Sequence, residues 1–429
     1  MTFADFILAH SYDDPAQLAL GRGRFMADVP DFDLALTTLE VRRKLRDKVP
    51  EWYAVPSLVF PFRVSGEQCS STSTAKYKAL VARAEINVPS TNGASLVLEG
   101  GEKVGSSTKP ASPVLGARLA DLTGGLGVDS WAFAQVFDQV LYNEMRPELA
   151  QAASHNFAEL GLTNVQVRNC ELVSGASCPA PTGHLLSEVL GDFRPDVIFL
   201  DPARRAADGR KVFRLEDCQP DVLKLLPELL AACPRILLKL SPMADITLVC
   251  KQLGCVKAVH VVAADGECKE LLLVLEKDWT GPYTLTIVED GAVMEIPGPD
   301  RSVMADSDRP SYLFEPGKAM MKAGAFEVPG NFGLQKLGKH THLYVGSEIP
   351  DALKPFGKTF RILEVVPLDK RSIKDIGQKY PKADVTARNI PLTSDQLRKK
   401  LGLADGGPIH IFGLHVDAQN ANCLIITSQ

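Results

Sequence analysis

Short β-rich runs alternate with helical patterns along the middle of the chain, and this alternation constrains the fold more than any other feature of the sequence. Five such runs are expected to be strands: Arg118 to Leu122, Gln139 to Asn143, Asn164 to Arg168, Asp196 to Leu200 and Arg235 to Leu240. Strands separated by helical patterns are typical of βαβ units, whose strands lie parallel in one sheet. The sequence therefore predicts an α/β fold.

Two further β-rich runs follow the fifth strand and are expected to close the sheet. They extend over Val256 to Ala263 and Lys269 to Glu276, and Asp265-Gly266 between them is a strong signal for a two-residue hairpin turn. A helix is expected from Pro147 to Leu160, because proline suits the first helical position and apolar side chains recur on one face. The predicted architecture is therefore a series of βα units and a final antiparallel hairpin.

This order of elements resembles the class I methyltransferase fold, a Rossmann-like sheet of seven strands in which the last strand is inserted antiparallel. A dehydrogenase half-domain also alternates strands and helices, but nothing in that architecture calls for a closing hairpin. The resemblance implies a seven-stranded catalytic sheet over the middle of this chain.

A glycine-rich loop extends from Asp121 to Ser130, directly after the first predicted strand. Its glycines let the backbone turn sharply and approach a ligand at the carboxyl edge of the sheet. Glu144 follows the second strand, 19 residues after Gly125, where its carboxylate can accept hydrogen bonds from ribose hydroxyls. The loop alone is equally compatible with a structural turn, but the two features together indicate an adenosine-containing cofactor. They do not distinguish S-adenosylmethionine from NAD, although Ser130 replaces the Gly or Ala of the dinucleotide motif.

The pentapeptide Asp201-Pro-Ala-Arg-Arg205 follows the fourth predicted strand, beside the glycine-rich loop of a doubly wound sheet. Its proline stiffens the turn. The Asp201 carboxylate and a fixed backbone carbonyl can hold an exocyclic amino group or a ring nitrogen in line with a methyl sulfonium, so proximity and orientation suffice for catalysis. The expected catalytic residues are Asp201, Pro202, Ala203 and Arg204. If the acceptor is a base, Arg204 or Arg205 can hold a phosphate or stack on the base, and structural salt bridges are the alternative for both.

Three motifs together resemble a bacterial family of class I S-adenosylmethionine-dependent methyltransferases with a THUMP-like domain at the C-terminus. Asp201-Pro-Ala-Arg is similar to the (D/N)PP(Y/F/R) motif of enzymes that methylate nitrogen atoms of nucleic-acid bases, and the loop from Asp121 is similar to their first motif. The third motif is Leu238-Lys-Leu-Ser-Pro-Met243. Ala203 departs from the pattern, because the base-methylating enzymes usually have a second proline there, and the acceptor atom stays open.

The resemblance implies S-adenosylmethionine as the cofactor and places its contacts at the ends of the first three strands. Glu171, after the third strand, corresponds to an acidic residue that methyltransferases often place near the adenine amino group. A solvated loop carboxylate is the alternative for Glu171. The candidate cofactor-binding residues are Asp121, Thr123, Gly124, Gly125, Gly127, Asp129, Glu144 and Glu171.

The patterns and the resemblance divide the chain into four predicted parts. They are an N-terminal helical region at 1–108, the catalytic domain at 109–277, a ferredoxin-like segment at 278–356 and a THUMP-like domain at 357–429. The two C-terminal parts are expected to be small α+β domains, and the last one to have the element order βαβαββ. Gly100 to Pro113 is interpreted as a linker. No function is predicted for the helical region.

The charges are distributed unevenly along the chain. The net charge is −5, but residues 354–400 hold 12 Lys or Arg against 5 Asp or Glu, a local surplus of +7. A basic segment on an acidic chain is a candidate phosphate-binding surface. The THUMP-like resemblance implies RNA as its ligand, and a solvated helix face with incidental charge is the alternative.

The sequence also argues against several classes of protein and site. No apolar run approaches the roughly 20 residues of a transmembrane helix, and the N-terminus has no signal-peptide pattern, so a cytoplasmic protein is expected. The nine cysteines include no CxxC pair, and His340 and His342 lack a further ligand set, so no metal is assigned. Cys218 and Cys233 are interpreted as buried structural cysteines rather than nucleophiles.

The leading functional hypothesis is methylation of a base nitrogen in a structured RNA, either rRNA or tRNA. Methylation of a protein or a small molecule remains open, as does a non-catalytic RNA-binding protein that retains the cofactor fold. The presence of Asp121, Glu144 and Asp201 together favours an active enzyme over the last alternative. The sequence makes no prediction of the oligomeric state.

Overall fold

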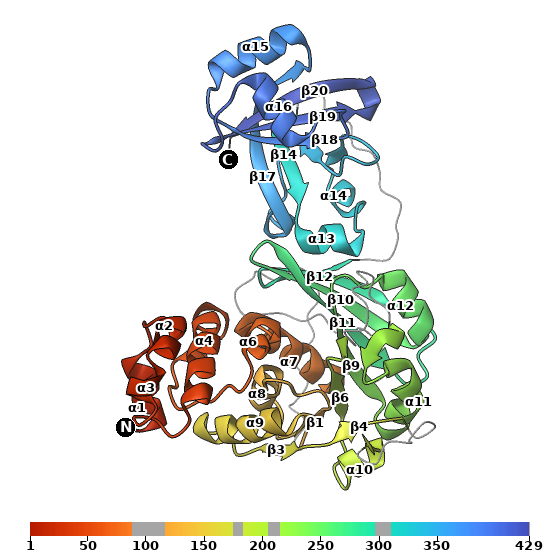
Figure 1. Ribbon diagram of the computed structural model, residues 1–429. Coiled ribbons are helices and arrows are strands. Elements are labelled where there is room, and N and C mark those ends of the chain that lie inside the picture. The colour runs from red at the N-terminus through yellow and green to blue at the C-terminus, as the bar shows by residue number, and fades with distance from the viewer. Residues whose placement is uncertain (88–115, 175–182, 205–214, 297–309, 429) are drawn as a thin grey trace. The chain divides into compact units, whose positions relative to one another are not determined.

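The computed structural model describes residues 1–87, 116–174, 183–204, 215–296 and 310–428, and the interpreted linker at 100–113 lies outside them. The chain forms two compact units (Figure 1). The first unit consists of residues 1–259 and 270–283, and the second of residues 260–269 and 284–429.

The N-terminal part of the first unit is helical, as predicted. Its helices are α1 (Phe3–Ala9), α2 (Pro15–Leu20), α3 (Arg22–Phe25), α4 (Phe32–Lys48), α5 (Pro50–Tyr53), α6 (Arg63–Gln68) and α7 (Thr72–Asn87). Asp31 begins α4 by accepting the backbone N–H of Leu34 at 2.9 Å. The Ser71 hydroxyl accepts the backbone N–H of Thr74 at 3.3 Å at the start of α7.

The largest sheet contains all the strands predicted for the middle of the chain. The parallel ones are β1 (Arg118–Asp121), β2 (Gln139–Asn143), β3 (Val165–Arg168), β6 (Val197–Leu200) and β9 (Arg235–Leu240). In space the order is β13-β12-β10-β11-β9-β6-β1-β2-β3. β11 (Glu267–Glu276) pairs antiparallel with β9 and lies between β9 and β10 (Val256–Ala264), which confirms the antiparallel insertion of the last predicted strand.

The sheet has nine strands, so the predicted number of seven is wrong. The two additional strands are β12 (Thr284–Glu289) and β13 (Ala292–Ile296), joined by a turn at Asp290 and Gly291 with φ angles of 47° and 89°. β12 continues the sheet from β10. Without this second hairpin, the edge of β10 would present unpaired backbone N–H and C=O groups, and the additional strands cover it.

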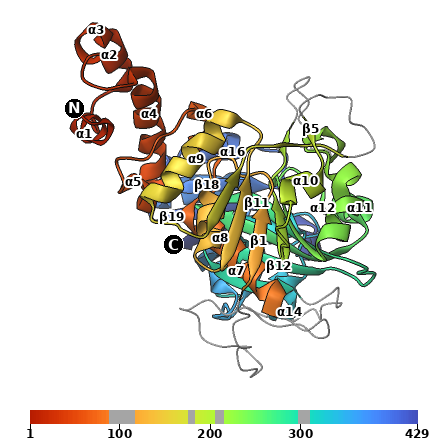
Figure 2. The ribbon, with the colours of Figure 1, turned by 90° about the horizontal axis from the view of Figure 1, so that it is seen from below.

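Helices cover both faces of the sheet, as Figures 1 and 2 show. On one side lie α7, α8 (Val128–Ala134) and α9 (Pro147–Glu159), and on the other α10 (Leu186–Leu190), α11 (Val222–Ala232) and α12 (Ile246–Leu253). Because both faces are covered, strands such as β6 are fully buried and apolar, and polar side chains gather at the strand ends. Two short sheets pair β4 (Glu171–Leu172) with β5 (Gly183–His184) and β7 (Ala203–Arg204) with β8 (Cys218–Gln219).

The second unit contains a seven-stranded sheet of order β15-β16-β14-β17-β20-β19-β18. Its first elements are β14 (Tyr312–Pro316), α13 (Lys318–Ala323), α14 (Val328–Asn331), β15 (Gln335–Lys336) and β16 (Tyr344–Gly346). They are followed by β17 (Gly357–Pro367), α15 (Lys370–Lys379), β18 (Asp384–Arg388), α16 (Ser394–Leu401), β19 (Ile409–Val416) and β20 (Ala421–Ser428), the predicted βαβαββ order. Ile376 of α15 and Leu397 of α16 pack on Ile411 and Ile426 of the sheet. Among the described helices, none is long and apolar enough to cross a membrane.

Candidate active site

Asp121 ends β1 with a fully buried side chain. Its Oδ2 accepts a hydrogen bond from the Ser130 hydroxyl at 2.6 Å, and its Oδ1 accepts the backbone N–H of Thr123 at 3.1 Å. Burial raises the pKa of Asp121 to about 7, while the two hydrogen bonds act in the opposite direction. The carboxylate therefore holds both ends of the glycine-rich loop against the strand.

Three glycines allow this loop to follow its path. Gly125 and Gly127 have φ angles of 53° and 93°, in the left-handed region that glycine adopts without strain. Gly124 lies against the ring of Tyr142, where a Cβ would come within 2.1 Å of a ring carbon. The Tyr142 hydroxyl donates to the Gly125 carbonyl at 2.6 Å. A Cβ on Gly125 would meet only the Thr123 carbonyl oxygen at 4.0 Å, so the backbone is open to a ligand there.

Glu144 directly follows β2 and faces the same loop. Its Oε2 accepts the N–H of Gly125 at 2.9 Å, and its Oε1 accepts the N–H of Arg146 at 2.9 Å. Each carboxylate oxygen keeps further acceptor capacity, so Glu144 can also accept hydroxyl donors of a ligand. The buried carboxylate and the open glycine backbone together fit the ribose of an adenosine-containing cofactor.

Glu171 lies in β4, and the segment before it is fixed beside Glu144. The side chain of Asn143 bonds both backbone polar groups of Cys170, with its Nδ2 donating to the carbonyl at 3.1 Å and its Oδ1 accepting the N–H at 3.1 Å. Asn169 donates to the Glu144 carbonyl at 2.7 Å. The ends of β2 and β3 are thereby joined, and Glu171 follows directly.

Asp201 begins the turn after β6 and contacts the glycine-rich loop. Its backbone N–H donates to the Thr123 hydroxyl at 2.6 Å. Its side chain is 37% exposed, and Oδ2 accepts a hydrogen bond from the Lys239 ammonium at 2.6 Å. The structure therefore brings together Thr123 and Asp201, which were predicted for cofactor binding and for catalysis respectively.

The rest of the predicted catalytic turn continues into a two-stranded sheet. Pro202 is buried and Ala203 is exposed. The backbone of Ala203 and Arg204 pairs antiparallel with Cys218 and Gln219 of β8. Arg205 lies outside the described residues. This pairing holds the turn at the end of β6.

A buried network of charges was not predicted from the sequence. Lys78 of α7 is fully buried, and its ammonium donates to the two carboxylate oxygens of Glu270 at 2.8 and 3.0 Å and to the Ser70 hydroxyl at 3.0 Å. It also lies 3.2 Å from Oδ1 of Asp129, whose Oδ2 accepts the Ser70 hydroxyl at 2.9 Å. The carboxylate of Asp129, a predicted cofactor residue, is thus engaged by the N-terminal helical region.

Lys239 of β9 connects these groups to Asp201. Its Nζ lies 2.6 Å from Oδ2 of Asp201 and 3.9 Å from Oε2 of Glu270. Burial lowers the pKa of Lys239, but Asp201 and Glu270 outweigh this effect and hold that pKa above its usual value. Lys239 is therefore charged at neutral pH. The five residues Lys78, Asp129, Asp201, Lys239 and Glu270 are called the lysine–carboxylate network below.

One sequence signal could have indicated part of this network. Lys239 and Glu270 lie within or beside apolar runs, Ile236 to Leu240 and Leu271 to Leu275, in strands that are buried on both faces. A charged side chain in such a strand needs a partner of opposite charge. The partner itself cannot be read from the sequence, because Lys78 and Glu270 are 192 residues apart.

Cys233 and His342 contact neighbouring groups of the protein. The Cys233 thiol donates to the Arg235 carbonyl at 3.2 Å, and burial raises the pKa of Cys233 to about 11, so the thiol stays protonated. His342 stacks on Phe326 with ring centroids 3.9 Å apart. Within the described ranges, no group of three or more His, Cys, Asp or Glu side chains is arranged to hold a metal ion.

Two family models match the C-terminal part of the chain. A model described as a ferredoxin-like domain matches residues 312–352, and a model described as THUMP domain-like matches residues 357–429. These two modules are a ferredoxin-like domain and a THUMP-like domain. The first covers β14 to β16, and the second covers the whole βαβαββ arrangement.

The chain is also similar to solved structures. A protein of Porphyromonas gingivalis W83, described as a "putative methyltransferase", is 29% identical with a TM-score of 0.77, over 100% of this chain and 97% of that one. The fold is that of a class I methyltransferase. An Aquifex aeolicus SAM-dependent methyltransferase is 18% identical over 38% of this chain and 82% of its own, with a TM-score of 0.26. A Streptococcus thermophilus rRNA methylase is 14% identical over 38% of this chain and 86% of its own, with a TM-score of 0.26. No curated protein matches the sequence.

In this methyltransferase fold, the candidate residues occupy the carboxyl ends of neighbouring strands. β1 lies between β6 and β2, and the three strands are parallel. Asp121, Glu144 and Asp201 therefore share one edge of the sheet. This is the edge at which open α/β sheets bind their ligands.

Proposed function

We propose that the protein is a cytoplasmic S-adenosylmethionine-dependent methyltransferase that modifies a base nitrogen in a structured RNA. The observation that carries the proposal is the hydrogen bond from the Asp201 N–H to the Thr123 hydroxyl, because it fixes the Asp-Pro turn beside the glycine-rich loop. A carboxylate for the acceptor and a loop for the cofactor are thereby held at adjacent strand ends. The similarity to the Porphyromonas gingivalis protein along the whole chain supports the same class of reaction.

The proposed cofactor contacts come from the ends of β1, β2 and β3. Glu144 accepts the ribose hydroxyls, and the backbone at Gly125 lies against the cofactor because no side chain intervenes there. Glu171 lies near the adenine amino group in this proposal. When bound, S-adenosylmethionine supplies an electrophilic methyl group on its sulfonium sulfur. Asp121 does not contact the cofactor in this proposal, but holds the glycine-rich loop in place.

Asp201 orients the acceptor nitrogen in this proposal. Its Oδ2 is occupied by Lys239, so its Oδ1 accepts an N–H of the acceptor amino group. This hydrogen bond directs the nitrogen lone pair toward the methyl carbon, and the amino proton passes to water as the nitrogen becomes methylated. Pro202 restricts the turn that presents the carboxylate. Catalysis then rests on proximity and orientation rather than on a strong base.

The THUMP-like domain supplies the proposed RNA-binding surface. Five basic side chains between residues 354 and 400 form ion pairs, namely Lys354, Arg371, Lys379, Arg388 and Arg398. The others are exposed and form no ion pair with a described residue. They are Lys358, Arg361, Lys370, Lys374, Lys382, Lys399 and Lys400. Cations without a carboxylate partner remain available to phosphates.

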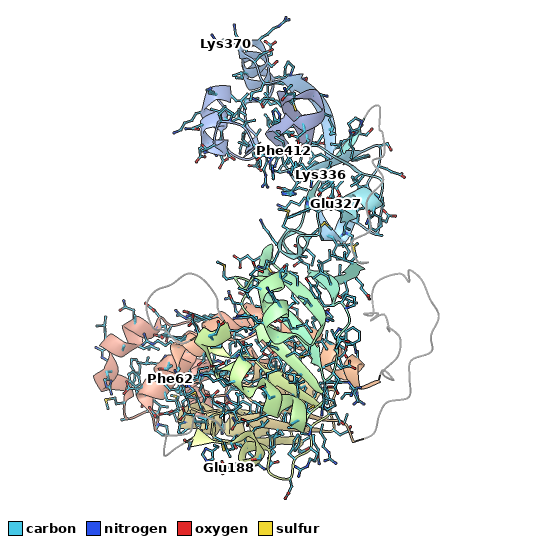
Figure 3. All side chains as sticks on the ribbon, turned by 90° about the vertical axis from the view of Figure 1, so that its right-hand side faces the viewer. Phe62, Glu188, Glu327, Lys336, Lys370 and Phe412 are labelled. Carbon is cyan, nitrogen blue, oxygen red and sulfur yellow. The ribbon has the colours of Figure 1, made fainter. Side chains whose placement is uncertain are left out.

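Two lysines of α15, Lys370 and Lys374, test this surface; Figure 3 labels Lys370. Replacing both by Ala is expected to reduce the slope of log affinity against log salt concentration by about two, because two phosphate contacts are lost. The measurement is filter binding of RNA over a salt series. Lys379→Ala on the same helix is the matched control, since Glu364 already neutralises Lys379. Equal changes of slope in both variants would argue against this surface.

Methyl transfer to RNA tests the proposed function directly. The purified protein and tritiated S-adenosylmethionine are incubated with total RNA from wild-type cells and from a strain lacking this gene. Label is expected only in the RNA of the deletion strain, where the natural site is unmodified. No label in either RNA, despite calorimetric binding of the cofactor, would contradict RNA as the acceptor and favour a protein or a small molecule.

A further inference from the structure

The lysine–carboxylate network reaches Asp201, yet protein stability does not explain it. Three carboxylates and two ammonium groups meet in it, and the side chains of Lys78 and Glu270 are 0% and 4% exposed. Removing such ions from water costs several kcal/mol each. Replacing both partners of a buried ion pair by apolar residues of similar volume often leaves protein stability unchanged or increases it. The positions of these charges therefore point to a functional role.

Lys239 has a defined effect on the geometry of Asp201. It projects from β9, which pairs in parallel with β6, the strand that Asp201 directly follows. Its ammonium is held in the sheet and binds Oδ2 of Asp201 at 2.6 Å. A charge-assisted bond to one carboxylate oxygen restrains the rotation of the side chain, and it thereby fixes the direction of Oδ1. Oδ1 is the atom that the proposed mechanism uses.

Lys78 keeps Lys239 available for this contact. Glu270 lies 3.9 Å from Lys239 and would compete with Asp201 for its ammonium. Lys78 donates to both oxygens of Glu270, at 2.8 and 3.0 Å, and so satisfies that carboxylate. Lys78 belongs to α7, so a residue of the N-terminal helical region is part of the arrangement behind Asp201.

We propose that Lys239 is a positioning residue for methyl transfer, which fixes the Asp201 carboxylate, and that Lys78 of the N-terminal helical region keeps Lys239 in place by neutralising Glu270. This inference rests on the proposed function and deepens it. Neither lysine touches the reacting atoms; both act through Asp201.

The test is a double-mutant cycle between Lys239 and Asp201, read out as tritium transfer to RNA of the deletion strain. Lys239→Met is expected to lower kcat about 100-fold with an unchanged KM for the cofactor, because a misplaced carboxylate affects the transition state alone. In an Asp201→Ala background, the same change is expected to alter kcat less than about threefold, since the side chain through which Lys239 acts is absent. Lys239→Arg retains the charge and is expected to recover about tenfold of the loss.

The outcomes separate the inference from the proposed function. Loss of transfer in Asp201→Ala with normal kcat in Lys239→Met would refute the inference alone, as would equal losses from Lys239→Met in both backgrounds. Full transfer by Asp201→Ala, or no transfer to this RNA by the unmodified protein, would refute the proposed function and the inference with it. If Lys239→Met does not fold, the same double-mutant cycle is measured with Lys239→Arg. This variant is expected to lower kcat about tenfold where Asp201 is present and to leave kcat unchanged where Asp201 is replaced.

Discussion

Replacing Asp201 by Ala is expected to lower the rate of methyl transfer about 10³-fold and to leave the affinity for S-adenosylmethionine unchanged. The side chain that orients the acceptor is removed. The glycine-rich loop stays in place, because Thr123 bonds to the backbone N–H of residue 201 rather than to its side chain. The loop is also held independently by Asp121 and Glu144. Tritium transfer measures the rate, and calorimetry measures the affinity for the cofactor.

Two further variants make this result specific. Asp192→Ala removes an exposed carboxylate that precedes β6, at the opposite end of the strand, and is expected to retain full activity. Asp201→Asn keeps the shape of the side chain and an acceptor oxygen but loses the charge. Its rate, compared with that of Asp201→Ala, therefore separates the contribution of the charge to methyl transfer from that of the hydrogen-bond acceptor. Unchanged turnover in Asp201→Ala would remove the assigned role. A parallel loss of cofactor affinity would place Asp201 in the cofactor site instead.

The ends of the parallel strands could be predicted because strands that are buried on both faces appear in the sequence as continuous apolar runs. β2 and β9 have the predicted bounds, since each is an apolar run with polar residues at its carboxyl end. That pattern places Glu144 and Asp201 at one edge of the sheet. The βαβαββ order of the THUMP-like domain was predicted from a different signal, alternating patterns bounded by turns.

The lysine–carboxylate network and the length of the sheet depend on contacts that no local pattern records. Lys78 lies in a helix, where a lysine is usually exposed, and its burial follows only from the packing of α7 on the sheet. The strand β12 pairs with the edge of β10, a strand that precedes it in the chain. The turn at Asp290-Gly291 indicates a hairpin, but it does not indicate which strand of the sheet this hairpin pairs with. Both features need the three-dimensional arrangement.

Replacing Lys78 by Met is expected to lower the free energy of unfolding of the first unit by about 3–5 kcal/mol. The side chains have similar volume, so the effect comes from the charge. Without the ammonium, the buried carboxylates of Glu270 and Asp129 lose the cation that contacts both of them. Lys239 can compensate only in part, because it lies 3.9 Å from Glu270 and is already bound to Asp201.

Urea unfolding followed by tryptophan fluorescence measures this loss in the first unit alone, because all three tryptophans, Trp52, Trp131 and Trp279, belong to it. Lys76→Met is the matched control. Lys76 lies on the same helix and pairs with Glu51 at 2.9 Å, but its side chain is 55% exposed, so its loss is expected to cost less than about 1 kcal/mol. Equal costs for the two variants would show that the buried charges do not depend on Lys78. A large cost with normal kcat in the folded Lys78→Met protein would restrict the N-terminal helical region to a structural role.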